Sequence, residues 1–206
     1  NIRGTSISGT IPEFKQTGRA INGKFGQSDR ALLARESRVG KRYILKTDIS
    51  RFYHSIYTHS IPWAIHGKQT AKSNREMTLL GNRLDFWIRQ GQDGQTIGIP
   101  IGPDTSLVIA EIIMQRCDNE LVAKIPNIKG TRFIDDYELA FSTRTEAEMA
   151  FHILESCLAD YEIALNPRKT IVSELPESLE SKWVAPLKDF RIRDTKQGQA
   201  SDLETY

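Results

Sequence analysis

Two short apolar runs and three longer amphipathic stretches outline the chain. Apolar and β-branched residues dominate segment 42–47 and both sides of the acidic pair at 135–136, which predicts a strand ending near residue 48 and a hairpin over 131–141. Apolar residues recurring at helical spacing predict three helices. Their stripes are Met77, Leu80, Leu84, Trp87 and Ile88, then Leu107, Ala110, Ile113, Met114, Cys117 and Leu121, and finally Met149, Ile153, Cys157 and Leu158.

Cap signals and helix breakers refine these elements. Segment 73–76 has the spacing of a capping box and is expected to open the first helix, while Thr145 with Glu148 is expected to open the third. A short helix is expected around 61–65. The first forty residues carry scattered glycines without a clear period, so we expect loops and short helices there. Short extended pieces are expected on either side of Pro167.

The order strand, helix, helix, hairpin, helix, strand predicts an α+β fold. In this fold an antiparallel sheet carries helices on one face, close to the split β-α-β or ferredoxin-like plan. A chain of 206 residues with 39% hydrophobic content can bury a real core. No segment is long and apolar enough for a membrane span, and no signal peptide opens the chain. Cys117 and Cys157 are expected to be buried free thiols of a cytoplasmic protein.

The charge of the chain is nearly balanced, at +2. Its distribution matters more, because Lys and Arg gather in two clusters. The first cluster precedes the first predicted strand and consists of Arg30, Arg35, Arg38, Lys41 and Arg42. The second follows the segment into which that strand leads and consists of Lys68, Lys72 and Arg75. Each cluster has two interpretations, a contact surface for nucleic acid or an ordinary solvated face.

Three carboxylates carry the strongest chemical signal. Asp135 and Asp136 lie at the tip of the predicted hairpin, and Asp48 lies at the end of the predicted strand. Adjacent carboxylates repel each other, so a divalent cation is a natural reason to hold them together. Oxygen ligands favour Mg²⁺ or Mn²⁺ over zinc. If the two strands are neighbours, Asp48 and Asp135 converge on one cation site, and two such ions suit in-line phosphoryl transfer.

Segment 98–106 is the second candidate for chemistry. Its glycines allow the backbone to approach a ligand closely, and the helix beginning near Ser106 offers free N–H groups to an anion. The alternative is plain turn geometry before a helix. His54 and His59 have no Cys or His at ligand spacing, so we do not assign them to a metal.

Taken together, these segments resemble the reverse transcriptases. Residues 48–56 resemble polymerase motif A, residues 98–106 motif B and residues 133–136 motif C, and 165–170 resembles the Leu-Asn-x-x-Lys-Thr pattern that follows motif C in bacterial members. The run Gly-Ile-Pro-Ile-Gly-Pro, followed by Ala-Glu-Ile-Ile at 110–113, is most similar to the abortive-infection and defence-associated reverse transcriptases of bacteria.

The resemblance implies a set of site residues. Asp48, Asp135 and Asp136 would be the catalytic carboxylates, and together with the Ile49 carbonyl they would hold Mg²⁺ or Mn²⁺. Tyr53 would lie under the sugar of the incoming nucleotide and exclude a ribose 2′-OH, the alternative being a core aromatic. The other implied nucleotide contacts are Arg51, Phe52, Gly102, Pro103, Ser106 and Lys169. Of these, Lys169 also suits a structural salt bridge and Arg51 a solvent-facing position.

Some positions depart from the family pattern. Ile101 stands before the motif B glycine, where many members have Gln, so contact with the template is expected to differ. No match to the basic nucleotide-gripping segment of the fingers precedes Asp48. The primer-grip hairpin is also not evident, and residues 183–190 stand roughly where it would lie.

By resemblance, the activity is RNA-directed DNA synthesis in anti-phage defence, with dNTPs, an RNA template and a DNA product. Template-independent or protein-primed synthesis by the same site is one alternative, and a catalytically silent scaffold that binds nucleic acid or protein is another. We expect partial fingers over 1–40, a palm with interleaved fingers elements over 41–175, and the start of a thumb or C-terminal helical region over 176–206. Further domains or a partner protein would supply the rest.

Overall fold

The structure is a computed structural model and describes residues 7–16, 18, 20–177, 195 and 199. The chain divides into two compact units, Asn1–Leu175 and Pro176–Tyr206. The primer-grip position at 183–190 lies outside the described residues, as does most of the expected thumb segment. The candidate site residues all belong to the first unit, which is described below.

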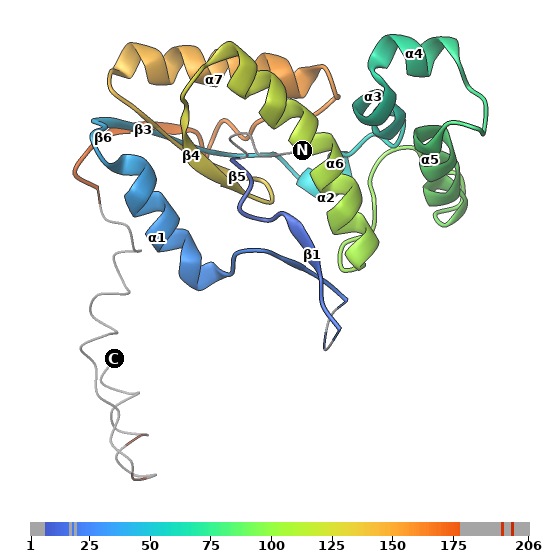
Figure 1. Cartoon of the computed structure of the whole chain (residues 1–206), viewed down its shortest axis with the longest axis horizontal. Helices are drawn as coiled ribbons and strands as arrows, with labels where there is room; N and C mark the ends of the chain where they lie inside the picture. The colour runs from blue at the N-terminus through green and yellow to red at the C-terminus, as the bar shows by residue number, and fades with distance from the viewer. Residues whose placement is uncertain (1–6, 17, 19, 178–194, 196–198, 200–206) are drawn as a thin grey trace. The chain divides into compact units, whose positions relative to one another are not determined.

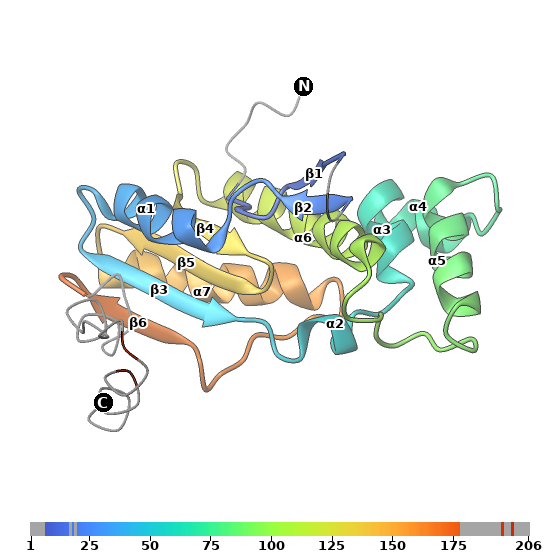
Figure 2. The same cartoon turned by 90° about the horizontal axis from the view of Figure 1, so that it is seen from below.

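A four-stranded antiparallel sheet forms the centre of the first unit (Figures 1 and 2). Its order is β4-β5-β3-β6, and the predicted strand and hairpin are its three adjacent strands β3, β5 and β4. The strands are β3 Tyr43–Asp48, β4 Lys129–Phe133, β5 Asp136–Phe141 and β6 Ile171–Glu174, and a separate two-stranded sheet joins β1 Pro12–Phe14 to β2 Ile21–Gly23.

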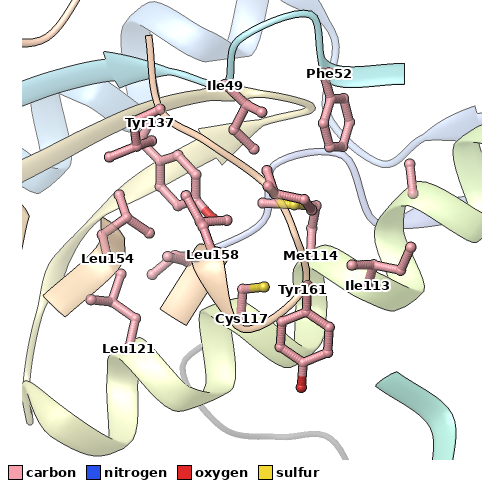
Figure 3. Packing of buried hydrophobic residues seen from close by; sticks show 14 of the residues in the cluster. Ile49, Phe52, Ile113, Met114, Cys117, Leu121, Tyr137, Leu154, Leu158 and Tyr161 are labelled. Atoms are coloured by element: carbon pink, nitrogen blue, oxygen red, sulfur yellow. The ribbon is translucent and has the colours of Figure 1, made fainter. Parts of the chain in front are cut away.

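Seven helices accompany the strands among the described residues. They are α1 Gln27–Arg38, α2 Phe52–Ser55, α3 Ser60–His66, α4 Lys68–Ser73, α5 Leu80–Gln90, α6 Asp104–Lys124 and α7 Arg144–Ala159. Figure 1 shows α6 and α7 on one face of the sheet. The main hydrophobic core lies between the sheet and these two helices, where Tyr137 of β5 meets Leu121 of α6 and Leu154 of α7 (Figure 3). The predicted α+β class with an antiparallel sheet is confirmed.

The expectation that helices cover only one face is wrong in one respect, because α1 packs against β4 and β5 on the other face (Figure 1). Side chains alternate between faces along a strand, so Ile44, Asp48 and Glu138 point away from the α6–α7 core. On that side Arg38 of α1 forms an ion pair with Glu138 at 2.7 Å. The helix was missed because two of its positions that face the sheet are Arg30 and Arg38, paired with Asp136 and Glu138, which interrupts the usual apolar stripe.

Two predicted helix starts also need correction. Ser73 ends α4 and does not cap the next helix, which begins at Leu80. The third predicted helix, α7, starts two residues earlier than expected, because Thr143 and Glu146 form its capping box. The sequence contains two overlapping Thr-x-x-Glu patterns here, and the second one, Thr145 with Glu148, is not used.

Two other expectations can be compared with the structure. Cys117 and Cys157 are free and buried, as predicted. Within the described part of the chain, no helix combines the length and apolar character needed to cross a bilayer.

Candidate active site

The sheet brings the acidic residues of two distant segments to one end. Asp48, the last residue of β3, is the register partner of Asp136, the first residue of β5. Asp135 lies in the turn between β4 and β5, and its carbonyl accepts a hydrogen bond from the Ile49 N–H at 3.2 Å. The predicted proximity of the two strands is therefore confirmed. Asp48, Ile49, Asp135 and Asp136 lie together at one end of the sheet, which is called the carboxylate edge below.

The turn that carries Asp135 has an unusual backbone. Ile134 has a φ of +57°, a left-handed conformation that β-branched residues rarely adopt. Two hydrogen bonds hold it there: the Ile134 N–H donates to Thr10 Oγ1 at 3.2 Å, and the Ile134 carbonyl accepts from Arg132 Nη1 at 2.8 Å. A strained backbone persists only where its surroundings fix it, and these two contacts do so.

Arg132 is the centre of a buried ionic cluster beneath this turn. Its guanidinium has no exposed surface and donates to Glu111 at 2.7 and 3.0 Å and to Asp118 at 2.8 to 3.2 Å. The Tyr137 hydroxyl also donates to Asp118, at 2.8 Å. Burial raises the pKa of Asp118, while burial and the nearby Asp118 charge raise the pKa of Tyr137 well above its ordinary value. Tyr137 therefore stays protonated and remains a donor.

The N-terminal segment completes the cluster. The hydroxyls of Ser8 and Thr10 each donate to Glu111 at 2.8 Å. The backbone of this segment also pairs with β4, since the Gly9 N–H donates to the Arg132 carbonyl at 2.7 Å. Thr10 thus links the buried carboxylate of Glu111 directly to the turn at Ile134.

Sequence reasoning missed this cluster. Its members lie in four separate segments, so no local spacing joins them. One signal was available, because Glu111 and Asp118 are seven residues apart and so lie on one face of α6 among its buried positions. Two carboxylates at such positions require a cationic partner.

Asp48 is nearly enclosed and has one unsatisfied atom. Its Oδ2 accepts a hydrogen bond from Lys169 Nζ, and this hydrogen bond raises the pKa of Lys169. Its Oδ1 is buried and has no hydrogen-bond partner in the described structure. A buried carboxylate oxygen without a partner is costly, and cation coordination is one way to satisfy it. The oxygen-only donor set at this edge fits Mg²⁺ or Mn²⁺.

The segment that follows α7 positions Lys169. It runs beside Asp48, because the Asn166 N–H donates to the Asp48 carbonyl at 2.8 Å. The side-chain carbonyl of Asn166 then accepts from the Arg168 N–H at 3.1 Å, which forms a tight turn. The hydroxyls of Thr170 and Thr47 lie 2.7 Å apart and join the end of this turn to β3.

The other two carboxylates have different surroundings. Asp136 is half-exposed and pairs with Arg30 of α1 at 3.0 Å. Burial raises the pKa of Asp135, and the negative charges of Asp136 and Asp48 raise it further, against an opposing effect of Lys169. In the part of the chain that the structure describes, no three acidic, imidazole or thiol groups form a ready-made metal cage. Arg30 and Lys169 instead neutralise one carboxylate each.

Helix α2 follows Asp48 directly and carries the predicted aromatic pair. Arg51, just before it, is exposed and has a φ of +50°. Phe52 lies in the hydrophobic core (Figure 3), so the expected nucleotide contact of Phe52 does not fit its position. Tyr53 is half-buried, and its carbonyl accepts from the Ile99 N–H at 2.8 Å, which holds the segment beginning at Gly98 against α2.

That segment reaches α6 through two glycines with positive φ. At Gly98, φ is +87° and a Cβ would lie 3.2 Å from the His54 carbonyl oxygen, so glycine is required for this close approach. At Gly102, φ is +114° and the space around a Cβ is open. Pro103 precedes α6 in an extended conformation, and Ser106 is buried in its first turn.

The histidines near the site have other environments. His59 Nδ1 lies 2.7 Å from Asp85, and His54 is exposed. Neither contacts the carboxylates of the sheet edge through any hydrogen bond found among the described residues.

Comparisons with known proteins agree with this fold. The chain is similar in fold to telomerase from Candida albicans, in complex with a TWJ fragment of telomeric RNA, with 14% identity, a TM-score of 0.53, and coverage of 74% of this chain and 31% of that one. It is also similar to apo telomerase from Candida tropicalis, with 15% identity, a TM-score of 0.50, and coverage of 72% of this chain and 32% of that one. The chain therefore spans about a third of the length of these telomerases.

A search of curated protein sequences finds no match. Residues 6–188, however, match the family described as reverse transcriptase (RNA-dependent DNA polymerase). Since this match covers most of the 206 residues, the chain belongs to the reverse transcriptase family.

Proposed function

We propose that the edge formed by Asp48, Asp135 and Asp136 is a nucleotidyl-transfer site that extends a 3′-hydroxyl with dNTPs on an RNA template. One observation carries the proposal. In a member of the reverse transcriptase family, the two acidic segments meet in register, and the nearly enclosed Asp48 keeps one carboxylate oxygen without a hydrogen-bond partner.

Reverse transcriptases use divalent metal ions, and the donor atoms here suit Mg²⁺, with Mn²⁺ as a substitute. Asp48, Asp135 and the Ile49 carbonyl would hold the metal, with Asp136 as a secondary ligand or a partner of the primer end. Bound metal would polarise the reacting phosphate and stabilise the charge of the departing pyrophosphate. Oδ1 of Asp48 is a buried oxygen with free coordinating capacity among the described residues.

Lys169 is proposed to act on the triphosphate. Its side chain is 65% exposed, so it can turn from Asp48 toward a phosphate at the sheet edge. The hydrogen bond to Asp48 raises the pKa of Lys169 in this arrangement. A lysine ammonium is protonated at neutral pH in either position, as a proton donor to pyrophosphate must be. Arg51, exposed at the start of α2, is the second candidate for phosphate contact.

Gly102, Pro103 and Ser106 are proposed to form the floor beneath the incoming base and the template. The open space at Gly102 supports this role, because a nucleic acid can approach backbone there without meeting a side chain. Ser106, buried in the first turn of α6, would support this floor.

Tyr53 is proposed to select deoxynucleotides. It follows Asp48 by five residues and is half-buried in α2, the helix that comes directly after Asp48. In this role its ring would occupy the space of a ribose 2′-OH. Tyr53→Ala should raise the ratio of ribonucleotide to deoxynucleotide incorporation about tenfold, equivalent to ~1.4 kcal/mol. Tyr53→Phe, which keeps the ring, should leave the ratio unchanged. An unchanged ratio in Tyr53→Ala would show that Tyr53 is a packing residue.

The experiment that tests the activity uses labelled dATP, dCTP, dGTP and dTTP, singly and together, with Mg²⁺ and with or without an RNA template and primer. Asp135→Asn serves as the control. Product that requires RNA and all four nucleotides, and is lost in the control, supports templated reverse transcription. Product identical in the control would come from a contaminating enzyme and would contradict the proposal.

Template-independent or protein-primed DNA synthesis is a second candidate, supported by the similarity of segment 98–113 to abortive-infection reverse transcriptases. Product formed from one nucleotide without added RNA, and attached to the protein, would favour it after nuclease treatment has removed co-purified RNA. The same similarity supports a cytoplasmic role in anti-phage defence. Bacteria expressing the protein should then survive phage infection better than bacteria expressing Asp135→Asn.

A scaffold without catalysis is a third candidate, because Lys169 and Arg30 neutralise Asp48 and Asp136 within the fold. Such a protein would bind nucleic acid or a partner protein but form no product under any of these nucleotide combinations. In the catalytic proposals, further domains or a partner protein would supply the thumb and primer-grip elements that the described residues do not contain.

A further inference from the structure

A second hollow lies away from the carboxylate edge. Helices α3, α4 and α5 lie beyond the end of the sheet toward which β3 points (Figures 1 and 2). Between them is a cavity of about 530 Å³, a volume within the usual range of small-molecule sites. Its lining combines aromatic rings with cations, chiefly Tyr57, Trp63, Phe86, Lys72, Arg75 and Arg89.

The aromatic side of this cavity is a connected surface. Tyr57 and Trp63 meet edge-to-face with ring centroids 5.6 Å apart. The ammonium groups of Lys68 and Lys72 lie over the Trp63 ring, at 4.5 and 5.6 Å from its centroid. This cation–π contact keeps Lys72 at the rim of the cavity rather than extended into solvent.

The charge of the cavity is unbalanced. Three cations face one carboxylate, Asp85, which is buried and already accepts from Arg89 at 3.1 Å and lies 2.7 Å from His59. Arg75 is exposed and makes no hydrogen bond or ion pair with any residue that the structure describes. The cavity therefore has positive charge available for an anion.

The two basic clusters of the sequence differ on this point. In the first, Arg30, Arg38 and Arg42 are each paired with a carboxylate of the sheet. In the second, Lys72 and Arg75 form no ion pair with the described residues. Three of the five members of the first cluster are therefore paired within the fold. In the second cluster Lys72 and Arg75, which both line the cavity, are available to an external anion.

We propose that the cavity between α3, α4 and α5 binds one unpaired nucleotide, its base against the rings of Tyr57 and Phe86 and its phosphate at Lys72 and Arg75. Aromatic faces bind any base by stacking, and flanking Lys and Arg bind the phosphate. The nucleotide is either free or part of a single strand. The inference rests on the proposed polymerase function only in that a template or product of the polymerase would be the source of such a strand.

Photo-crosslinking tests the location directly. A single strand of about twelve nucleotides, carrying 5-iodouracil, is irradiated with Asp135→Asn protein in the absence of metal, so that the result does not depend on catalysis. The proposal predicts a crosslink to Tyr57, Trp63 or Phe86. Crosslinks confined to segments outside the cavity would overturn it.

Affinity measurements identify the ligand. Arg75→Glu should weaken binding of the same strand about tenfold, whereas Arg83→Glu, on the same subdomain but outside the cavity lining, should not. Circular dichroism verifies that both variants fold, as expected for exposed positions. Equal weakening by both variants would show general electrostatic attraction and overturn the proposal.

Three further probes distinguish the chemistry. An abasic strand of equal length should bind about tenfold less tightly, because it has no base to stack. Tight binding of AMP, lost in Arg75→Glu, would identify a free nucleotide as the ligand, while tight binding of the strand alone would identify a single strand. Binding of polyglutamate as tight as that of the strand, with the same dependence on Arg75, would indicate an acidic protein partner and contradict the proposal.

Discussion

Asp135 bears an electrostatic cost in the folded protein. Burial raises its pKa, and the charges of Asp136 and Asp48 add to this. Because the pKa in the folded state exceeds that of the unfolded chain, about 3.9, the charged form is disfavoured by folding. This cost is absent below the unfolded value and complete above the folded value, so stability attributable to Asp135 falls as the pH rises through that window.

Asp135→Asn removes this charge. Metal-free Asp135→Asn protein should therefore have a higher Tm than the native protein at neutral pH. The gain should shrink as the pH is lowered toward the unfolded-state pKa of about 3.9, because the cost of the charged form is lost below that value. The measurement is thermal unfolding by circular dichroism with chelator present. A lower Tm for Asp135→Asn at neutral pH would contradict the account, since it would mean that the carboxylate stabilises the fold without metal.

At the scale of elements, the hairpin between β4 and β5 depends on a segment far from it in sequence. Thr10 Oγ1 accepts from the Ile134 N–H and donates to Glu111, so one hydroxyl joins the strained turn to the buried ionic cluster. The geometry of Asp135, the next residue, is thus set partly by the N-terminal segment.

Thr10→Val tests this connection, because valine has the same shape without the hydroxyl. Loss of the hydroxyl leaves buried groups without their partner, so the free energy of unfolding should fall by about 1–3 kcal/mol in urea titration. In the DNA-synthesis assay, kcat should fall while KM for dNTP changes little, because the turn is displaced but the nucleotide contacts remain. Thr10→Ser keeps the hydroxyl and should restore both values.

The opposite pattern in Thr10→Val, a raised KM with unchanged kcat, would show that this segment acts on nucleotide binding and not on the carboxylate turn. Reduced stability with native kinetics would show that Thr10 has only a structural role.

Local signals determined which elements could be predicted. β3 and the hairpin were evident because apolar runs end at the acidic residues 48 and 135–136. The cluster around Arg132 of β4 was not evident, because its partners Glu111 and Asp118 come from helix α6 and Thr10 comes from the first segment of the chain. Helix α1 was missed for a related reason, since its residues Arg30 and Arg38 pair with carboxylates of the sheet.

At the scale of the whole molecule, the carboxylate edge and the cavity between α3, α4 and α5 belong to the same unit and carry opposite charges. The edge is acidic and shielded by two intramolecular cations, Arg30 and Lys169. The cavity retains cations that are not neutralised by the described residues. A negatively charged strand would therefore be attracted to the cavity, and metal would be needed for it to approach the edge.

The positions of Asp48, Asp135 and Asp136 could be predicted because a short motif and a strand order suffice to bring them together. The hydrogen-bond partners of these carboxylates could not be predicted. The side chain of Lys169, for example, reaches Asp48 only once the turn after Asn166 has formed.

The most direct test of the central claim is Mn²⁺ binding measured by electron paramagnetic resonance in the presence of dATP. The account predicts that the native protein binds Mn²⁺ and that Asp48→Asn and Asp135→Asn do not. Asp93→Asn, an exposed loop carboxylate with a positive φ that asparagine accepts, is the matched control and should bind as the native protein does. Equal Mn²⁺ binding by native protein and Asp135→Asn would contradict the assignment of this edge as a metal-dependent polymerase site.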